Sequence, residues 1–141
     1  MILADINVLV YAHRQDLPQH QGFSDWLEEE VRSGRGYALC DATLTGFLRV
    51  VTNVRIFENP TPLDVALRVV EELRGQPGAI HLLPGPRHWP LFTDLCSAIG
   101  ARGNDVPDAY LAALAIESGS ELITADRGFG RFPGLRWSCP V

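Results

Sequence analysis

The feature that most constrains the fold is a short apolar run near the start of the chain that ends in a carboxylate. Residues 1–4 (MILA) precede Asp5, and a second apolar run over residues 6–12 (INVLVYA) follows directly. A short apolar run of this kind is typical of a strand buried in the middle of a parallel sheet. Asp5 belongs at the end of that strand, because an unpaired carboxylate within it would be costly to bury. Since ligands bind at the carboxyl ends of strands in open parallel sheets, the sequence predicts an acidic site there.

Short apolar runs alternate with longer amphipathic segments along the rest of the chain. After the first strand, we expect strands over residues 37–40, 80–83, 121–124 and 135–137. Helices are expected over residues 7–13, 18–33, 41–54, 61–75, 87–99 and 107–116. Asp41 or Thr43 is expected to cap the third helix, and Thr61 the fourth, with Pro62 as its first residue. This alternation predicts an α/β fold with a central parallel sheet of four to five strands and helices on both faces.

The size and composition of the chain limit the class of protein. The 141 residues are expected to form one domain, residues 1–141, with a core that needs no disulfide or structural metal. No window approaches the roughly 20 apolar residues of a membrane span, and no basic segment precedes the first apolar run. We therefore expect a cytoplasmic protein without a membrane partner. The three cysteines lack the paired spacing of a disulfide framework or a zinc site.

Two further carboxylates are expected near the end of the first strand. Asp126 follows the strand predicted over residues 121–124, so parallel pairing brings it to the same sheet edge as Asp5. Asp108 lies in the first turn of a predicted helix, three residues after Asp105. Crowded carboxylates repel one another unless a cation lies between them. The pattern therefore indicates a site for a hard divalent ion such as Mg²⁺ or Mn²⁺, which activates water in phosphoryl transfer.

The chain resembles the PIN-domain ribonucleases, and within them the VapC toxins of bacterial toxin–antitoxin pairs. Residues 5–12 (DINVLVYA) look like the opening motif of that family, residues 108–115 (DAYLAALA) like its third acidic motif, and residues 124–129 (TADRGF) like its fourth. Residues 46–53 and 133–137 are similar to further VapC segments. The resemblance implies a PIN-like three-layer sandwich and a Mg²⁺- or Mn²⁺-dependent endoribonuclease. It also implies RNA as substrate, a homodimer, inhibition by a VapB-type antitoxin, and Asp5, Asp108 and Asp126 as catalytic and metal-binding residues.

Two positions depart from the family pattern. Gly46 stands where many members carry a glutamate on the third helix, and Gly128 stands where the fourth motif often has a further acid, two residues after its aspartate. A site with fewer carboxylates is expected to bind metal less tightly, or to bind one ion in place of two. Asp105 and Asp41 are the candidates to compensate. A carboxylate restored at position 46 is expected to point at the other acids and to tighten metal binding.

The interpretation that follows is a metal-dependent endoribonuclease, the toxin of a type II toxin–antitoxin system. A catalytically weak PIN scaffold that binds RNA or a partner protein is the alternative, and a small phosphatase is a third. The net charge of −5 argues against general polyanion binding, and the absence of lysine excludes mechanisms that need one. Arg127, directly after Asp126, is the arginine expected nearest the chemistry. The candidates for contact with RNA phosphates are Arg14, Arg49, Arg55, Arg127, Arg131 and Arg136.

Overall fold

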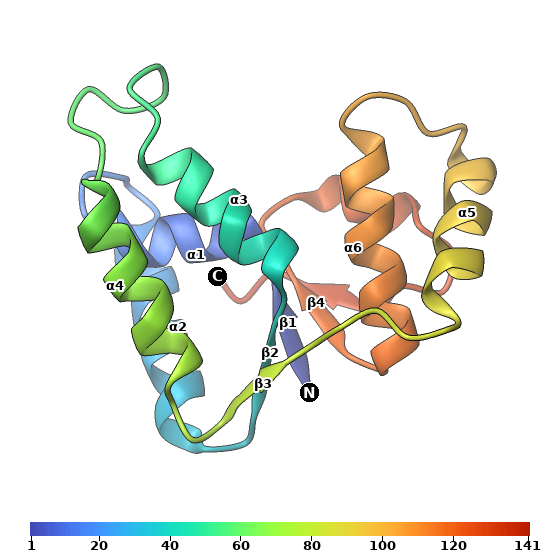
Figure 1. The fold of residues 1–141 in the computed structure, drawn as a ribbon, viewed down its shortest axis with the longest axis horizontal. Helices are drawn as coiled ribbons and strands as arrows, with labels where there is room; N and C mark the ends of the chain where they lie inside the picture. Colours follow the sequence, from blue (N-terminus) through green and yellow to red (C-terminus); the bar gives the residue numbers. More distant parts are fainter.

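A computed structural model describes all 141 residues and shows a parallel sheet with helices on both of its faces (Figure 1). The five strands lie in the order β3-β2-β1-β4-β5, and every neighbouring pair is parallel. Their bounds are Ile2–Ala4 (β1), Tyr37–Leu39 (β2), Ala79–His81 (β3), Glu121–Ile123 (β4) and Trp137–Ser138 (β5). The predicted α/β class and the predicted parallel sheet are confirmed.

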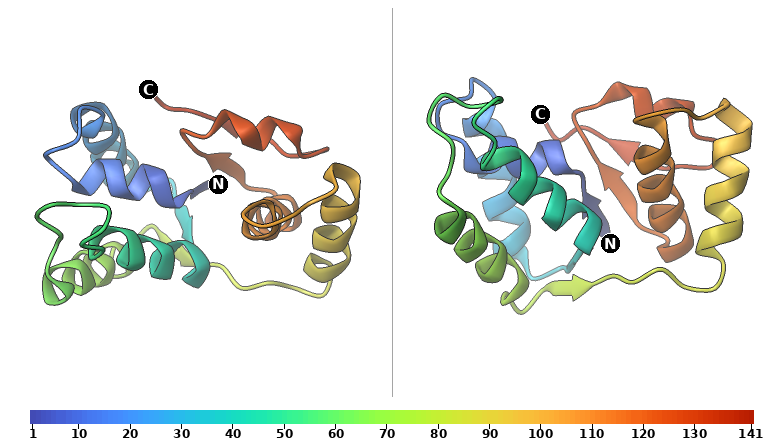
Figure 2. Two further views of the ribbon diagram at one scale, coloured as in Figure 1. Left: turned by 90° about the horizontal axis from the view of Figure 1, so that it is seen from above. Right: turned by 45° about the horizontal axis from the view of Figure 1, so that its top comes forward.

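The helices form two layers on either side of this sheet. In Figure 2, α1 to α4 lie on one side of the strands, and α5 and α6 lie on the other. The helices span Ile6–His13 (α1), His20–Ser33 (α2), Asp41–Val51 (α3), Leu63–Arg74 (α4), His88–Ile99 (α5) and Asp105–Ser118 (α6). A 3₁₀ helix, η1, spans Arg127–Arg131. No helix combines the length and the apolar character that crossing a membrane requires.

Alternating side chains of the strands serve two separate cores, as the period of a strand requires. Ala4, Leu39 and Ile123 face α1 to α4 in one core, together with Phe47 and Val51 of α3. Leu3, Ala38 and Leu122 face the opposite way and pack with α5, α6 and η1. The central strands β1, β2 and β4 are covered on both faces and are largely apolar, and this explains why their positions can be read from the sequence.

Two predicted helix caps are wrong. The helix α3 begins at Asp41 itself, with Cys40 at the N-cap position and no side-chain cap. The helix α4 begins at Leu63, with Pro62 as its N-cap residue. Thr61 does not cap it, because the Thr61 hydroxyl contacts His13 Nε2 at 2.9 Å and Arg14 Nη1 at 3.3 Å. The Thr61 hydroxyl therefore binds residues nearly 50 positions away in the sequence in place of a local helix-capping contact.

The loop between α3 and α4 is held against α1 by Arg14, which is buried. Its guanidinium donates to both oxygens of Asp16, at 2.9 and 2.7 Å, and to the Asn59 carbonyl at 2.8 Å. It also lies over the Phe57 ring, 4.0 Å from the ring centroid. Arg14 is therefore a structural residue, and its prediction as an RNA-binding residue is wrong.

The order of the strands determines where a ligand site forms. From β1 the chain passes to β2 and β3 on one side, and it then returns to β4 and β5 on the other. The reversal leaves a crevice at the C-terminal ends of β1 and β4, which is where open α/β sheets bind ligands. Ala4 pairs with Ile123, so Asp5 and Thr124 leave the sheet side by side.

Candidate active site

A cavity of about 500 Å³ lies at this crevice, and all three predicted acids line it. Asp5 comes from the end of β1, Asp108 from the first turn of α6, and Asp126 from the turn after β4. The remaining wall is largely apolar. It is formed by Ile6, Asn7, Val10, Tyr11, Leu17, Val50, Ile56 and Phe57. The fold thus brings together side chains separated by more than 100 positions in the sequence.

Asp5 is the most enclosed of the three carboxylates, with 8% of its surface exposed. It ends β1 and caps α1, because its Oδ1 accepts from the backbone N–H of Ile6 at 2.7 Å. Burial raises its pKa, against the effect of hydrogen bonds from Thr124 and Ile6, and the negative charges of Asp108 and Asp126 raise it further. The carboxylate is therefore held in one orientation in surroundings that disfavour its negative charge.

A polar network around Thr124 fixes this orientation. The fully buried Thr124 hydroxyl donates to Asp5 Oδ2 at 2.8 Å and accepts from the backbone N–H of Asp126 at 3.0 Å. Asn7 Nδ2 donates to the same hydroxyl at 3.3 Å, while Asn7 Oδ1 accepts from the Ala125 N–H at 3.2 Å. Asn7 and Thr124 thus tie the end of β1 to the end of β4 and set the positions of two of the acids.

Asp108 lies beside Arg131, one of the six arginines that the sequence suggested for contact with RNA phosphates. Arg131 Nη2 donates to Asp108 Oδ2 at 3.2 Å and to Asp105 Oδ1 at 3.1 Å. Burial raises the pKa of Asp108, the hydrogen bond and charge of Arg131 lower it, and the carboxylates of Asp126 and Asp105 raise it. The side chain of Arg127, by contrast, makes no hydrogen bond or ion pair, although it directly follows Asp126. Arg131, rather than Arg127, is the arginine at the site.

The side-chain oxygen atoms that line the cavity are of the chemical type that binds hard divalent ions. Three carboxylates line it together with the Tyr11 phenol, without histidine or cysteine, and Mg²⁺ and Mn²⁺ prefer oxygen ligands of this kind. No group of three His, Cys, Asp or Glu side chains is spaced closely enough to hold an ion as it stands. Binding of an ion by all three carboxylates would therefore require them to move closer together, and the pairing of Asp108 with Arg131 is one contact that such a movement would change.

The two predicted substitute acids lie in different surroundings. Asp105 adjoins the site through its contact with Arg131. Asp41 is exposed at the start of α3, where its Oδ1 lies 2.9 Å from His81 Nε2, and it does not line the cavity. Of the two, only Asp105 is placed to act on the site.

Gly46 does not face open space, contrary to the prediction made from its place in the family motif. A Cβ atom built there would lie 2.2 Å from Ile6 Cδ1 and 2.8 Å from Ile6 Cγ1, so the side chain of Ile6 occupies the volume that a glutamate would need. Ile6 itself lines the cavity. Gly46→Glu alone is therefore not expected to tighten metal binding, because a side chain at position 46 meets Ile6 before it reaches the acids.

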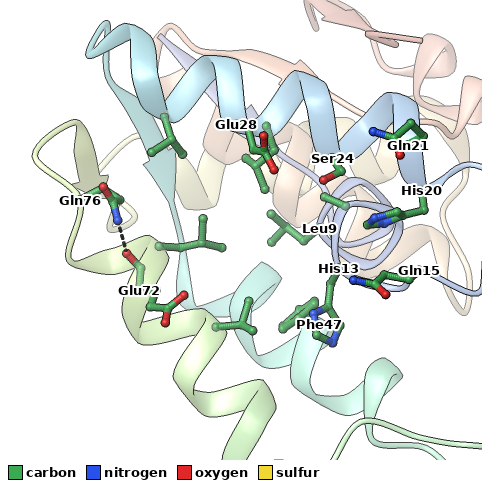
Figure 3. A pocket seen from close by; sticks show the side chains of 15 residues that line it. Leu9, His13, Gln15, His20, Gln21, Ser24, Glu28, Phe47, Glu72 and Gln76 are labelled. Carbon is green, nitrogen blue, oxygen red and sulfur yellow. Dashed lines mark hydrogen bonds between the residues drawn. The ribbon is translucent and has the colours of Figure 1, made fainter.

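A second cavity, of about 510 Å³, lies away from the acids between α1, α2, α3 and α4 (Figure 3). Its apolar floor includes Leu9, Leu27, Phe47 and Leu73, and Glu28 and Glu72 line it from α2 and α4. We call this second cavity the groove. The periodicity of the sequence does not indicate it, because its lining comes from four helices.

The family model of the PIN domain matches residues 2–135. VapC ribonuclease Mb2897 of Mycobacterium bovis is 46% identical over 141 residues, which cover 100% of this chain and 96% of that protein. Ribonuclease VapC25 of Mycobacterium tuberculosis is 38% identical over 136 residues, 96% of each chain.

Solved structures show the same fold at low sequence identity. VapBC2 from Rickettsia felis, bound to a DNA fragment from its promoter, superposes with a TM-score of 0.70 at 18% identity, covering 99% of this chain and 98% of that one. FitAB bound to the IR36 DNA fragment superposes with a TM-score of 0.69 at 18% identity, covering 99% and 95%.

Proposed function

Because this chain belongs to the PIN-domain family and to its VapC ribonucleases, we propose that it is a metal-dependent endoribonuclease, the toxin of a type II toxin–antitoxin pair. The observation that carries the proposal is the convergence of Asp5, Asp108 and Asp126 on one cavity at the switch point of the sheet. The names of the curated relatives support RNA as the substrate.

In this proposal each residue of the site has a distinct task. Asp5, Asp108 and Asp126 would hold Mg²⁺ or Mn²⁺. A bound ion makes water more acidic and stabilises charge on the leaving oxygen. Thr124 keeps Asp5 oriented through its hydroxyl, and Asn7 holds the turn that carries Asp126.

A circular single-stranded RNA tests the type of reaction directly. We expect the purified protein with Mn²⁺ to convert the circle into linear fragments, because an endonuclease needs no chain end. The measurement is denaturing gel electrophoresis, with a linear RNA of the same sequence as the reference. A circle that stays intact, while phosphate is released from a terminally phosphorylated linear RNA, would favour the phosphatase. An RNA that is bound but never cut would favour the scaffold.

The groove between α1, α2, α3 and α4 is the proposed binding place for a VapB-type antitoxin. Its apolar floor suits an amphipathic segment, and the carboxylates of Glu28 and Glu72 suit basic side chains on that segment. The solved structures of VapBC2 and FitAB support an antitoxin partner of this kind. An antitoxin bound in this groove would lie apart from the cavity of the three acids, because the two cavities share no lining residue.

A homodimer is proposed on a different surface. Val54, Ile56, Leu63 and Leu67 are 75%, 51%, 58% and 43% exposed, and they lie on α4 and the loop before it. Leu63 and Leu67 are one helical turn apart and so share a face of α4. Exposed apolar residues gathered in this way are typical of a protein–protein interface.

Two double variants test both partner surfaces and act as controls for each other. We expect light scattering to show a dimer, and co-expression with the product of the neighbouring gene to give a stable complex. Glu28→Arg with Glu72→Arg should lose the antitoxin and keep the dimer, because it reverses the charge of the groove. Leu63→Arg with Leu67→Arg should give a monomer. A monomeric wild type would refute the homodimer. Retention of the antitoxin by the Glu28→Arg, Glu72→Arg variant would refute the groove as its binding place.

A further inference from the structure

Arg131 joins the candidate active site to a carboxylate outside the cavity. Its Nη2 lies 3.2 Å from Asp108 and 3.1 Å from Asp105, which are one helical turn apart at the start of α6. Arg131 itself ends η1, so the ion pairs connect two elements that adjoin the cavity. Its side chain is 31% exposed, so the guanidinium can exchange partners without crossing the core.

The glycine at position 128 makes this approach possible. A Cβ built on Gly128 would lie 3.0 Å from Arg131 Nη1 and 2.9 Å from Asp126 Oδ1. Arg131 Nη1 also donates to the Gly128 carbonyl, and the guanidinium lies over the Phe132 ring, 4.6 Å from its centroid. The guanidinium thus passes closely over a position where the family pattern often has an acid, and it is held there by three kinds of contact.

From this arrangement we propose that Arg131 is a tethered cation that competes with the divalent ion for Asp108 and so sets the metal affinity of the site. The inference rests on the proposed function, in that it takes Asp108 to be a metal ligand. Arg131 balances the charge of Asp108 while no ion is bound. When an ion draws Asp108 toward Asp5 and Asp126, Arg131 keeps its second partner, Asp105, and remains beside the site.

The competition has a definite sign. When a ligand binds only the free form of a group, its apparent Kd is the intrinsic Kd divided by the fraction of the group that is free. Removing Arg131 frees Asp108 and also removes a positive charge that repels the ion. Both effects tighten metal binding. If Arg131 served only to hold Asp108 in its productive position, its removal would instead weaken metal binding.

Isothermal titration calorimetry of Mn²⁺ binding to the protein in the absence of RNA tests the proposal. We expect Arg131→Gln to lower the Kd of Mn²⁺ by a factor of about 3 to 10, a range suited to a partly exposed ion pair. Arg131→Lys should stay close to wild type, because the charge is kept. The matched control is Arg127→Gln, which removes the same charge from the same 3₁₀ turn at a residue without any ion pair.

Each contrary result has a separate meaning. An unchanged or raised Kd for Arg131→Gln would overturn the competition while leaving a metal-dependent enzyme intact. Equal tightening by Arg127→Gln would show an effect of net charge alone and would overturn it as well. Failure of the wild type and all variants to bind Mn²⁺ would remove the metal from the proposed function, and the inference with it. Circular dichroism of each variant confirms that the fold is retained.

Discussion

Asp5→Asn is expected to reduce RNA cleavage about 1000-fold while the protein remains folded. Asparagine has nearly the size of aspartate and can accept the hydrogen bond from the Ile6 N–H, but it carries no charge for a metal ion. Metal stabilisation of a phosphoryl transition state is worth several kcal/mol, and each 1.4 kcal/mol or so corresponds to a factor of ten in rate. The measurement is the initial rate of cleavage of a circular RNA at saturating Mn²⁺, beside thermal unfolding of the same preparation.

Asp41→Asn is the matched control for this result. Asp41 also follows a strand, β2, but its side chain is exposed and pairs with His81 outside the cavity. The same chemical change there should leave the cleavage rate within about twofold of wild type, since exposed ion pairs contribute little. A rate for Asp5→Asn within tenfold of wild type, or an equal loss from both variants, would place the chemistry elsewhere.

Gly46→Glu is expected to lower the free energy of unfolding by about 2 kcal/mol or more. Overpacking a well-filled site costs about 1–3 kcal/mol, and a carboxylate with no partner adds a desolvation penalty. The gain of replacing a helical glycine, about 0.8–1.0 kcal/mol, offsets only part of this. The clash is with a single side chain, Ile6, whose Cδ1 would lie 2.2 Å from the new Cβ. Urea unfolding measures the loss.

A double-mutant cycle with Ile6→Ala identifies the cause. If Ile6 fills the space, Gly46→Glu should be less destabilising by about 1–2 kcal/mol when Ile6 is already alanine. Gly46→Ala is the size control, because it adds the Cβ without the charge. Additive losses in the cycle would show that Ile6 is not the obstacle, and the packing of α3 on α1 at Gly46 would need another explanation.

The parts of the fold that could be predicted are those encoded locally. The central strands β1, β2 and β4 are buried on both faces and so read as apolar runs, and parallel pairing of β1 with β4 then requires Asp5 and Asp126 to reach the same edge. Asp108 reaches that edge because α6 begins beside it. The convergence of the three acids therefore follows from the order of strands and helices. Their roles in metal binding remain a prediction.

The details that could not be predicted depend on contacts between distant residues. Gly46 matched a motif position, but the obstacle, Ile6, is 40 positions away. Thr61 fits the pattern of an N-cap, yet its hydroxyl contacts His13 and Arg14. Arg127 is nearer to Asp126 in sequence than Arg131, whereas the turn of η1 directs Arg131 toward Asp105 and Asp108. Sequence proximity does not determine which side chain a short turn directs inward.

We propose that the cavity of Asp5, Asp108 and Asp126 cleaves RNA with a divalent ion. Cleavage of the circular RNA in EDTA, followed by addition of excess Mn²⁺ to the same sample, tests it most directly. We expect the circle to remain intact in EDTA and to be linearised once Mn²⁺ is added, at a rate that saturates with Mn²⁺ concentration. Full-rate cleavage in EDTA would contradict the account, because the three carboxylates would then act without an ion.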